Sequence, residues 1–100
     1  MIVKNDPKIH HGINEGNYNM DKNYVNGFRF WINGNRAIWH INEWNQWAIG
    51  DLKNVGSKYR GIRSSVDAQC PEKVRNGYWD FSYKSKWYNA GSNIQIKCLS

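Results

Sequence analysis

Short stretches in which apolar and polar residues alternate recur along the chain, separated by residues that favour turns. Residues 94–98 alternate strictly, so Ile94, Ile96 and Cys98 share one face of a predicted strand. No stretch shows the 3.6-residue period of an amphipathic helix. Because β-branched and aromatic side chains suit pleated strands, the pattern predicts short antiparallel strands. Further segments of this kind are 28–32, 36–41, 46–49, 59–63, 78–81 and 86–88.

Asn-Gly pairs mark the ends of several of these segments. Both central residues of a type I′ hairpin turn have positive φ, which Asn and Gly tolerate best. We therefore expect a meander of hairpins, with a four-residue link at 42–45 and a further turn around 83–85. The Asn-Gly pairs are Asn26-Gly27, Asn33-Gly34 and Asn76-Gly77.

Tryptophan spacing indicates a supersecondary unit that is used twice. Trp39 and Trp47 stand eight residues apart, as do Trp79 and Trp87. Alternation predicts which side chains of the two units point inward and which point outward. The predicted inward set is Trp39, Ile41, Trp47, Ile49, Trp79 and Phe81, and the predicted outward set is Ile38, His40, Tyr78 and Asp80.

The length of 100 residues predicts one domain. Residues 1–15 are polar and show no clear period, so we expect a flexible N-terminal tail followed by a single β domain over 16–100. The predicted fold is all-β: a small antiparallel sandwich or barrel of about seven or eight short strands, built from Trp-rich hairpins.

Two cysteines, Cys70 and Cys98, are compatible with one disulfide. A bond between them would close a loop of 27 residues. Chain entropy would then stabilise the fold by roughly 3–4 kcal/mol. Because a small exported domain gains much from such a bond, the sequence favours a disulfide over two reduced thiols.

Charge is moderately basic, with fourteen Lys and Arg against eight Asp and Glu, a net charge of +6. A solvated basic surface accounts for this balance, and anionic partners are compatible with it. Part of the positive charge is clustered at Lys53, Lys58, Arg60 and Arg63.

The aromatic residues predicted at turn tips, Trp44 and Tyr83, are the best candidates for ligand contact. An aromatic face can stack on the C–H face of a sugar ring while neighbouring polar groups bind its hydroxyls. A packing role, with Trp44 folded back over its own hairpin, is the competing interpretation. The candidate ligand-binding residues are Trp44, Asn45, Asn42, Tyr83 and Asp80, joined by Arg60 and Arg63 if the glycan is anionic.

The sequence contains no recognisable catalytic or metal-binding motif. His40 and Glu43 lie close in sequence, but no nucleophile motif surrounds Ser64 or Ser65. Two cysteines without histidines at ligand spacing do not form a zinc site. We expect no enzyme activity, no metal and no cofactor. No apolar run has the length of a membrane helix or a signal peptide, so we expect no membrane insertion.

The sequence therefore predicts a non-catalytic, lectin-like recognition module whose partner is a glycan or polysaccharide, including anionic ones. The alternative is a protein-interaction or structural module of an extracellular protein, with a protein partner or a homo-oligomer. Binding of single-stranded nucleic acid ranks below both, because no recognised nucleic-acid motif is present. We expect an extracellular or surface-exposed location, with a cytosolic one as the alternative.

Overall fold

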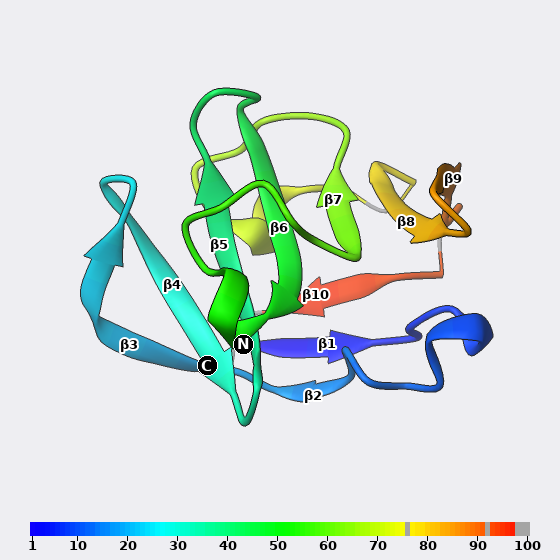
Figure 1. Ribbon diagram of the computed structural model, residues 1–100, viewed down its shortest axis with the longest axis horizontal. Helices are drawn as coiled ribbons and strands as arrows, with labels where there is room; N and C mark the ends of the chain where they lie inside the picture. Colours follow the sequence, from blue (N-terminus) through cyan, green and yellow to red (C-terminus); the bar gives the residue numbers. More distant parts are fainter. Residues whose placement is uncertain (76, 92, 98–100) are drawn as a thin grey trace.

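The chain forms two antiparallel β-sheets in the computed structural model, which describes residues 1–75, 77–91 and 93–97 (Figure 1). The predicted all-β fold is confirmed, with ten strands in the described residues instead of seven or eight. The strands are β1 (Ile2–Lys4), β2 (Gly16–Asn17), β3 (Asn19–Val25), β4 (Phe28–Asn33), β5 (Arg36–Ile41), β6 (Gln46–Asp51), β7 (Ile62–Ser64), β8 (Trp79–Tyr83), β9 (Lys86–Asn89) and β10 (Gln95–Lys97). Short 3₁₀ helices span Lys8–His10, Leu52–Asn54 and Pro71–Lys73.

The larger sheet is a seven-stranded meander in the order β3-β4-β5-β6-β7-β8-β9. The smaller sheet has the order β10-β1-β2, and its strands run across the direction of β5 and β6 (Figure 1). Val3 and Ile96 of the small sheet share a core with Ile38, Trp47 and Ile49 of the large sheet. The two sheets therefore form a small β-sandwich.

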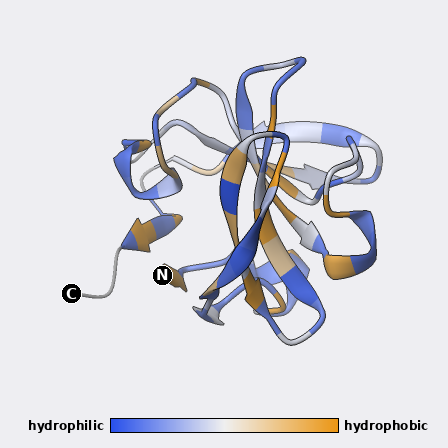
Figure 2. Ribbon diagram, turned by 90° about the vertical axis from the view of Figure 1, so that its left-hand side faces the viewer, coloured by the Kyte–Doolittle hydropathy of each residue, from blue (hydrophilic) through white to orange (hydrophobic). Residues whose placement is uncertain are grey.

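The opposite face of β5 and β6 is also covered. Trp39, Ile41 and Ala48 form a second core, against which Val55 packs from the segment after β6. The indole nitrogen of Trp39 donates a hydrogen bond to the Ser57 carbonyl at 3.0 Å. The central strands are therefore buried on both faces, and Figure 2 shows hydrophobic segments along the strands.

This double coverage corrects the predicted faces of β5. Ile38 and His40 were expected to point outward, but both are buried. Register places His40 opposite Trp47 and Trp39 opposite Ala48, so the two tryptophans point to opposite faces. Alternation identifies two faces correctly, but it cannot show that a second layer covers the outer one.

Two of the predicted turns take the expected form. Asn26 and Gly27 link β3 to β4 with positive φ, and the residues 42–45 link β5 to β6. The second Asn-Gly turn is shifted by one residue, because Asn33 still pairs with Arg36 and closes the strand. Asn76, from the third pair, lies outside the described residues.

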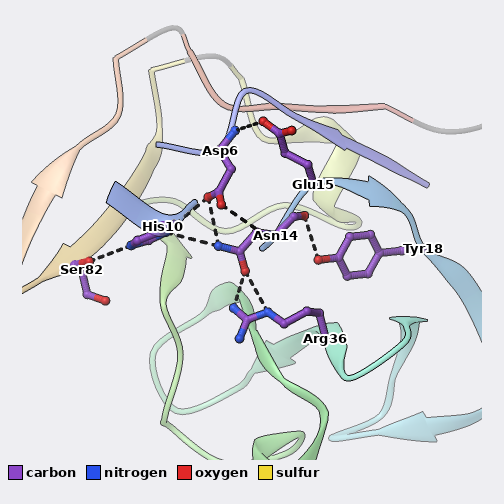
Figure 3. A network of polar contacts seen from close by, with 7 residues as sticks. All are labelled: Asp6, His10, Asn14, Glu15, Tyr18, Arg36 and Ser82. Carbon is purple, nitrogen blue, oxygen red and sulfur yellow. Dashed lines mark hydrogen bonds and ion pairs between the residues drawn. The ribbon is translucent and has the colours of Figure 1, made fainter. Parts of the chain in front are cut away.

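The expected N-terminal tail is wrong, because residues 1–15 are part of the fold. Val3 is 1% exposed and lies in the central strand of the small sheet. Asn14 is buried, and its amide donates to Asp6 while its carbonyl oxygen accepts from Arg36 (Figure 3). His10 donates through Nε2 to the Ser82 carbonyl at 2.8 Å, which connects this segment to β8. Mutual hydrogen bonding buries a polar segment that carries no apolar pattern.

Cys70 lies at the start of the helix Pro71–Lys73, where its thiol is 3.3 Å from the Glu72 carboxylate. Burial, and then the contact with Glu72, raise the pKa of this thiol. Cys98 lies outside the described residues, so the disulfide stays a prediction.

Candidate functional site: an arginine–tryptophan groove

Strand register brings charged and aromatic side chains to one face of the large sheet. Ala48 of β6 is opposite Arg63 of β7, and Arg63 is opposite Asp80 of β8. Asn89 of β9 is opposite Asp80, so Trp87, two residues earlier, points to the same side. This part of the sheet extends beyond the second core and is open to solvent at an arginine–tryptophan groove.

We define the Arg–Trp groove by the side chains that line it. It is a hollow of about 380 Å³, within the ~300–1,000 Å³ range of ligand pockets. Its lining residues are Trp44, Gln46, Arg60, Arg63 and Trp87.

The loop between β5 and β6 places Trp44 at the rim of the groove. Asn45 adopts positive φ, and its backbone nitrogen donates to the Asn42 carbonyl. The Asn42 side chain contacts His40 Nδ1 at 2.6 Å and donates to the Asn26 carbonyl at 2.7 Å. These bonds fix the loop, and Trp44 remains 43% exposed.

Cations and indole rings alternate through the groove. The Arg60 guanidinium carbon lies 4.5 Å from the centre of the Trp44 ring and 4.8 Å from that of Trp87. The Arg63 guanidinium lies 4.1 Å from the Trp87 ring centre. Lys58 Nζ lies over Trp44 at 5.2 Å. Such cation–π contacts stabilise the arrangement by roughly 0.5–2 kcal/mol each.

The three cations differ in their polar partners. Lys58 forms an ion pair with Glu43, and Arg63 Nε lies 3.3 Å from the Asp80 carboxylate. Arg60 instead donates to two neutral oxygens, the Gln46 amide at 3.1 Å and the Lys58 carbonyl at 2.8 Å. Its Nε is buried and has no hydrogen-bond partner among the described residues.

Arg60 therefore differs from Lys58 and Arg63 in its electrostatic environment. Burial, and then the charge of Arg63, lower the pKa of the Arg60 guanidinium. Guanidinium stays protonated in proteins, so the charge remains, and no carboxylate of the part of the chain that the structure describes forms an ion pair with it. An incoming anion would balance this charge.

The structure gathers only part of the predicted site. Trp44, Arg60 and Arg63 line the groove, whereas Tyr83 and Asn45 do not. The polar groups of Asn42 are engaged in the loop, and Asp80 binds Arg63 and Asn89. Tyr83 lies at the end of β8, with Lys84 Nζ 5.2 Å from its ring centre.

Trp87 and Gln46 are the groove residues that sequence reasoning missed. The repeat suggested that Trp87 matches the buried Trp47. His40 is opposite Trp47 and Ser82 is opposite Trp87, so in both hairpins the second tryptophan lies on the face opposite the first. Register across β6 and β7 places Trp39 on the same face as Asp80, so the two hairpins turn opposite faces to the main core and Trp87 lies in the groove. Hairpin length could show the first relation, but the sequence did not show the second.

Comparisons of the chain with protein families, curated proteins and solved structures find no match. Within the described ranges, no helix is long and apolar enough to cross a membrane. The groove itself is therefore the basis for a functional proposal.

Proposed function

We propose that this domain is a non-catalytic recognition module that binds anionic carbohydrate in the Arg–Trp groove. One observation carries the proposal. The guanidinium of Arg60 lies between two indole rings in an open hollow, and its hydrogen bonds go to neutral oxygens. A carboxylate or sulfate on a sugar would supply the charge that this arginine lacks.

Guanidinium groups suit such a ligand for geometric reasons. Their planar N–H donors match the two oxygens of a carboxylate and form charge-assisted hydrogen bonds. The neighbouring rings of Trp44 and Trp87 hold the Arg60 guanidinium in place, which reduces the entropy lost on binding. Gln46 lies beside it and can exchange hydrogen bonds with sugar hydroxyls.

The same geometry disfavours ligands that bind by stacking, such as neutral sugars and the unpaired bases of single-stranded nucleic acid. Both would use indole faces as stacking platforms. Here Arg60 and Arg63 lie over the Trp87 ring, and Lys58 and Arg60 lie over Trp44. A ligand would therefore meet the cations before the indole faces. We expect an acidic sugar that pairs with the cations, not a neutral sugar that stacks on indole.

An array of neutral, carboxylated and sulfated glycans at physiological salt tests the proposal. We expect selective binding of acidic glycans and a loss of at least about tenfold in affinity for Arg60→Gln, since a charge-assisted hydrogen bond is worth ~1.5–3 kcal/mol. Arg29→Gln is the matched control, because Arg29 also stacks on an aromatic ring, that of Tyr24, but on β3 and β4. Equal affinity of wild type and Arg60→Gln would refute the proposed site, and a blank array would favour a protein-interaction role.

A further inference from the structure

Arg60 lines a second hollow as well as the Arg–Trp groove. This second hollow, which we call the Tyr59 hollow, has a volume of about 390 Å³. Both hollows are large enough for a small ligand, and they share one lining residue, Arg60. Residues that line the Tyr59 hollow include Arg36, Asp51, Tyr59, Arg60, Gly61 and Ser82.

The two hollows differ in charge. In the Tyr59 hollow Arg36 forms an ion pair with Asp51 at 2.6 Å, and its Nε donates to Asn14 at 3.0 Å (Figure 3). His10 on the same wall donates to the Ser82 carbonyl. The charge of Arg36 is therefore balanced internally, unlike that of Arg60 in the Arg–Trp groove.

Tyr59 offers the Tyr59 hollow an aromatic surface. The residue lines the hollow and is 76% exposed, the highest value among the large hydrophobic residues described as exposed. A ring so exposed contributes little to the core, so its free face is available to stack on the C–H face of a sugar.

A close backbone approach holds Tyr59 and Arg60 in position. A Cβ atom on Gly50 of β6 would lie 3.2 Å from the Arg60 Cα, 3.4 Å from the Tyr59 carbonyl oxygen and 3.0 Å from the Trp39 ring. Glycine at this position lets the 59–60 segment lie directly against the sheet. The junction of the two hollows is thus built on the rigid central strands.

We propose that the two hollows form one extended site for a linear acidic glycan in which charged and uncharged sugars alternate. The charged unit pairs with Arg60 in the Arg–Trp groove, and the adjacent uncharged unit lies in the Tyr59 hollow against Tyr59. This inference rests on the proposed function, and it adds the length and charge pattern of the ligand.

Calorimetric titration with two tetrasaccharides tests the inference. A hyaluronan tetrasaccharide alternates uronate with an uncharged sugar, whereas tetragalacturonate is charged at every unit. We expect wild type to bind the alternating tetrasaccharide at least about threefold more tightly. Tyr59→Ala should remove this preference, while Tyr24→Ala, which removes a tyrosine of β3 that is 60% exposed and lines neither hollow, should retain it.

The outcomes separate this inference from the proposed function. If Tyr59→Ala binds both tetrasaccharides as wild type does while Arg60→Gln weakens both, the extended site is wrong and the proposed function stands. If wild type shows no preference between the two, the assigned charge pattern is wrong. If neither tetrasaccharide binds to wild type, the extended site is overturned, and the sulfated glycans of the array decide whether the proposed function stands. Because the Tyr59 side chain is largely exposed, its loss should leave the unfolding temperature unchanged.

Discussion

At the scale of single residues, the neighbours of each cation decide its role. Asp80 and Glu43 lie at the two ends of the row of cations, next to Arg63 and Lys58. Arg60 lies between them and contacts neutral oxygens. A sequence shows the three cations but not their partners, because each acidic partner comes from a different hairpin.

Glu43 should act as an internal competitor for an anionic ligand. Its carboxylate pairs with Lys58, so Glu43→Gln frees that ammonium for the ligand. Because the pair is exposed, we expect a modest gain of about two- to fivefold in affinity for acidic glycans, and a smaller gain at high salt. Titrations at two salt concentrations would measure it.

Glu72→Gln is the control for this substitution, since it makes the same change in net charge at Glu72, next to Cys70 and away from the Arg–Trp groove. Weaker binding by Glu43→Gln than by Glu72→Gln would show instead that the ion pair organises the groove.

At the scale of elements, the β5–β6 and β8–β9 hairpins have similar tryptophan spacing but place their second tryptophans in different environments. In both hairpins the second tryptophan lies on the face opposite the first, but the two hairpins turn opposite faces to the main core, so Trp47 is buried while Trp87 lines the Arg–Trp groove. The repeat therefore predicts the hairpins but not an equal role for their tryptophans.

Substitutions in the β8–β9 turn should make the folded state more stable. Lys84 and Ser85 have φ of 48° and 63°, a conformation that costs residues with a Cβ about 1 kcal/mol each. We expect the double substitution Lys84→Asn, Ser85→Gly to stabilise the fold by about 1 kcal/mol in urea unfolding, since these residues suit the turn.

The reciprocal exchange is the control, because Asn26 and Gly27 occupy the equivalent turn between β3 and β4. Asn26→Lys with Gly27→Ser should destabilise the fold by more than this, because the Asn26 amide also donates a hydrogen bond to the His40 carbonyl at 2.8 Å. Unchanged stability in both variants would show that these turns contribute little to folding.

At the scale of the whole molecule, the sequence predicted the large sheet better than the small one. The hairpins of β3 to β6 followed from Asn-Gly turns and aromatic alternation. β1 has only three residues, and the segment that follows it is buried through polar contacts such as that between Asp6 and Asn14. A short strand and a buried polar network leave no periodic signal. Arg60 was a candidate from the sequence and lines the groove, but the predicted strand 59–63 is shorter in the structure, where β7 spans only Ile62–Ser64.

Tyr18 links this N-terminal segment to the core, so alkaline pH should destabilise the domain. Its hydroxyl donates to the Asn14 carbonyl at 2.8 Å, and burial raises the pKa of Tyr18 to about 12. An unfolded tyrosine has a pKa near ~10, so the protonated form is favoured by folding. This stability is present below pH ~10 and is lost as the pH rises toward ~12, by up to ~2 kcal/mol.

Urea unfolding at a series of pH values would measure this loss. Tyr18→Phe should be less stable at neutral pH but should show a shallower decline above pH ~10. An equal alkaline decline in both proteins would mean that another group is responsible.

The position of the ligand is the most direct test of the account. Trp39 and Trp47 are buried and donate their indole N–H groups to Ser57 and Ala68, so they serve as internal references. We would titrate isotope-labelled protein with the hyaluronan tetrasaccharide and follow the indole N–H signals by NMR. The account predicts saturable shifts of the Trp44 and Trp87 signals, with those of Trp39 and Trp47 nearly unchanged. Unchanged Trp44 and Trp87 signals at ligand saturation would contradict it.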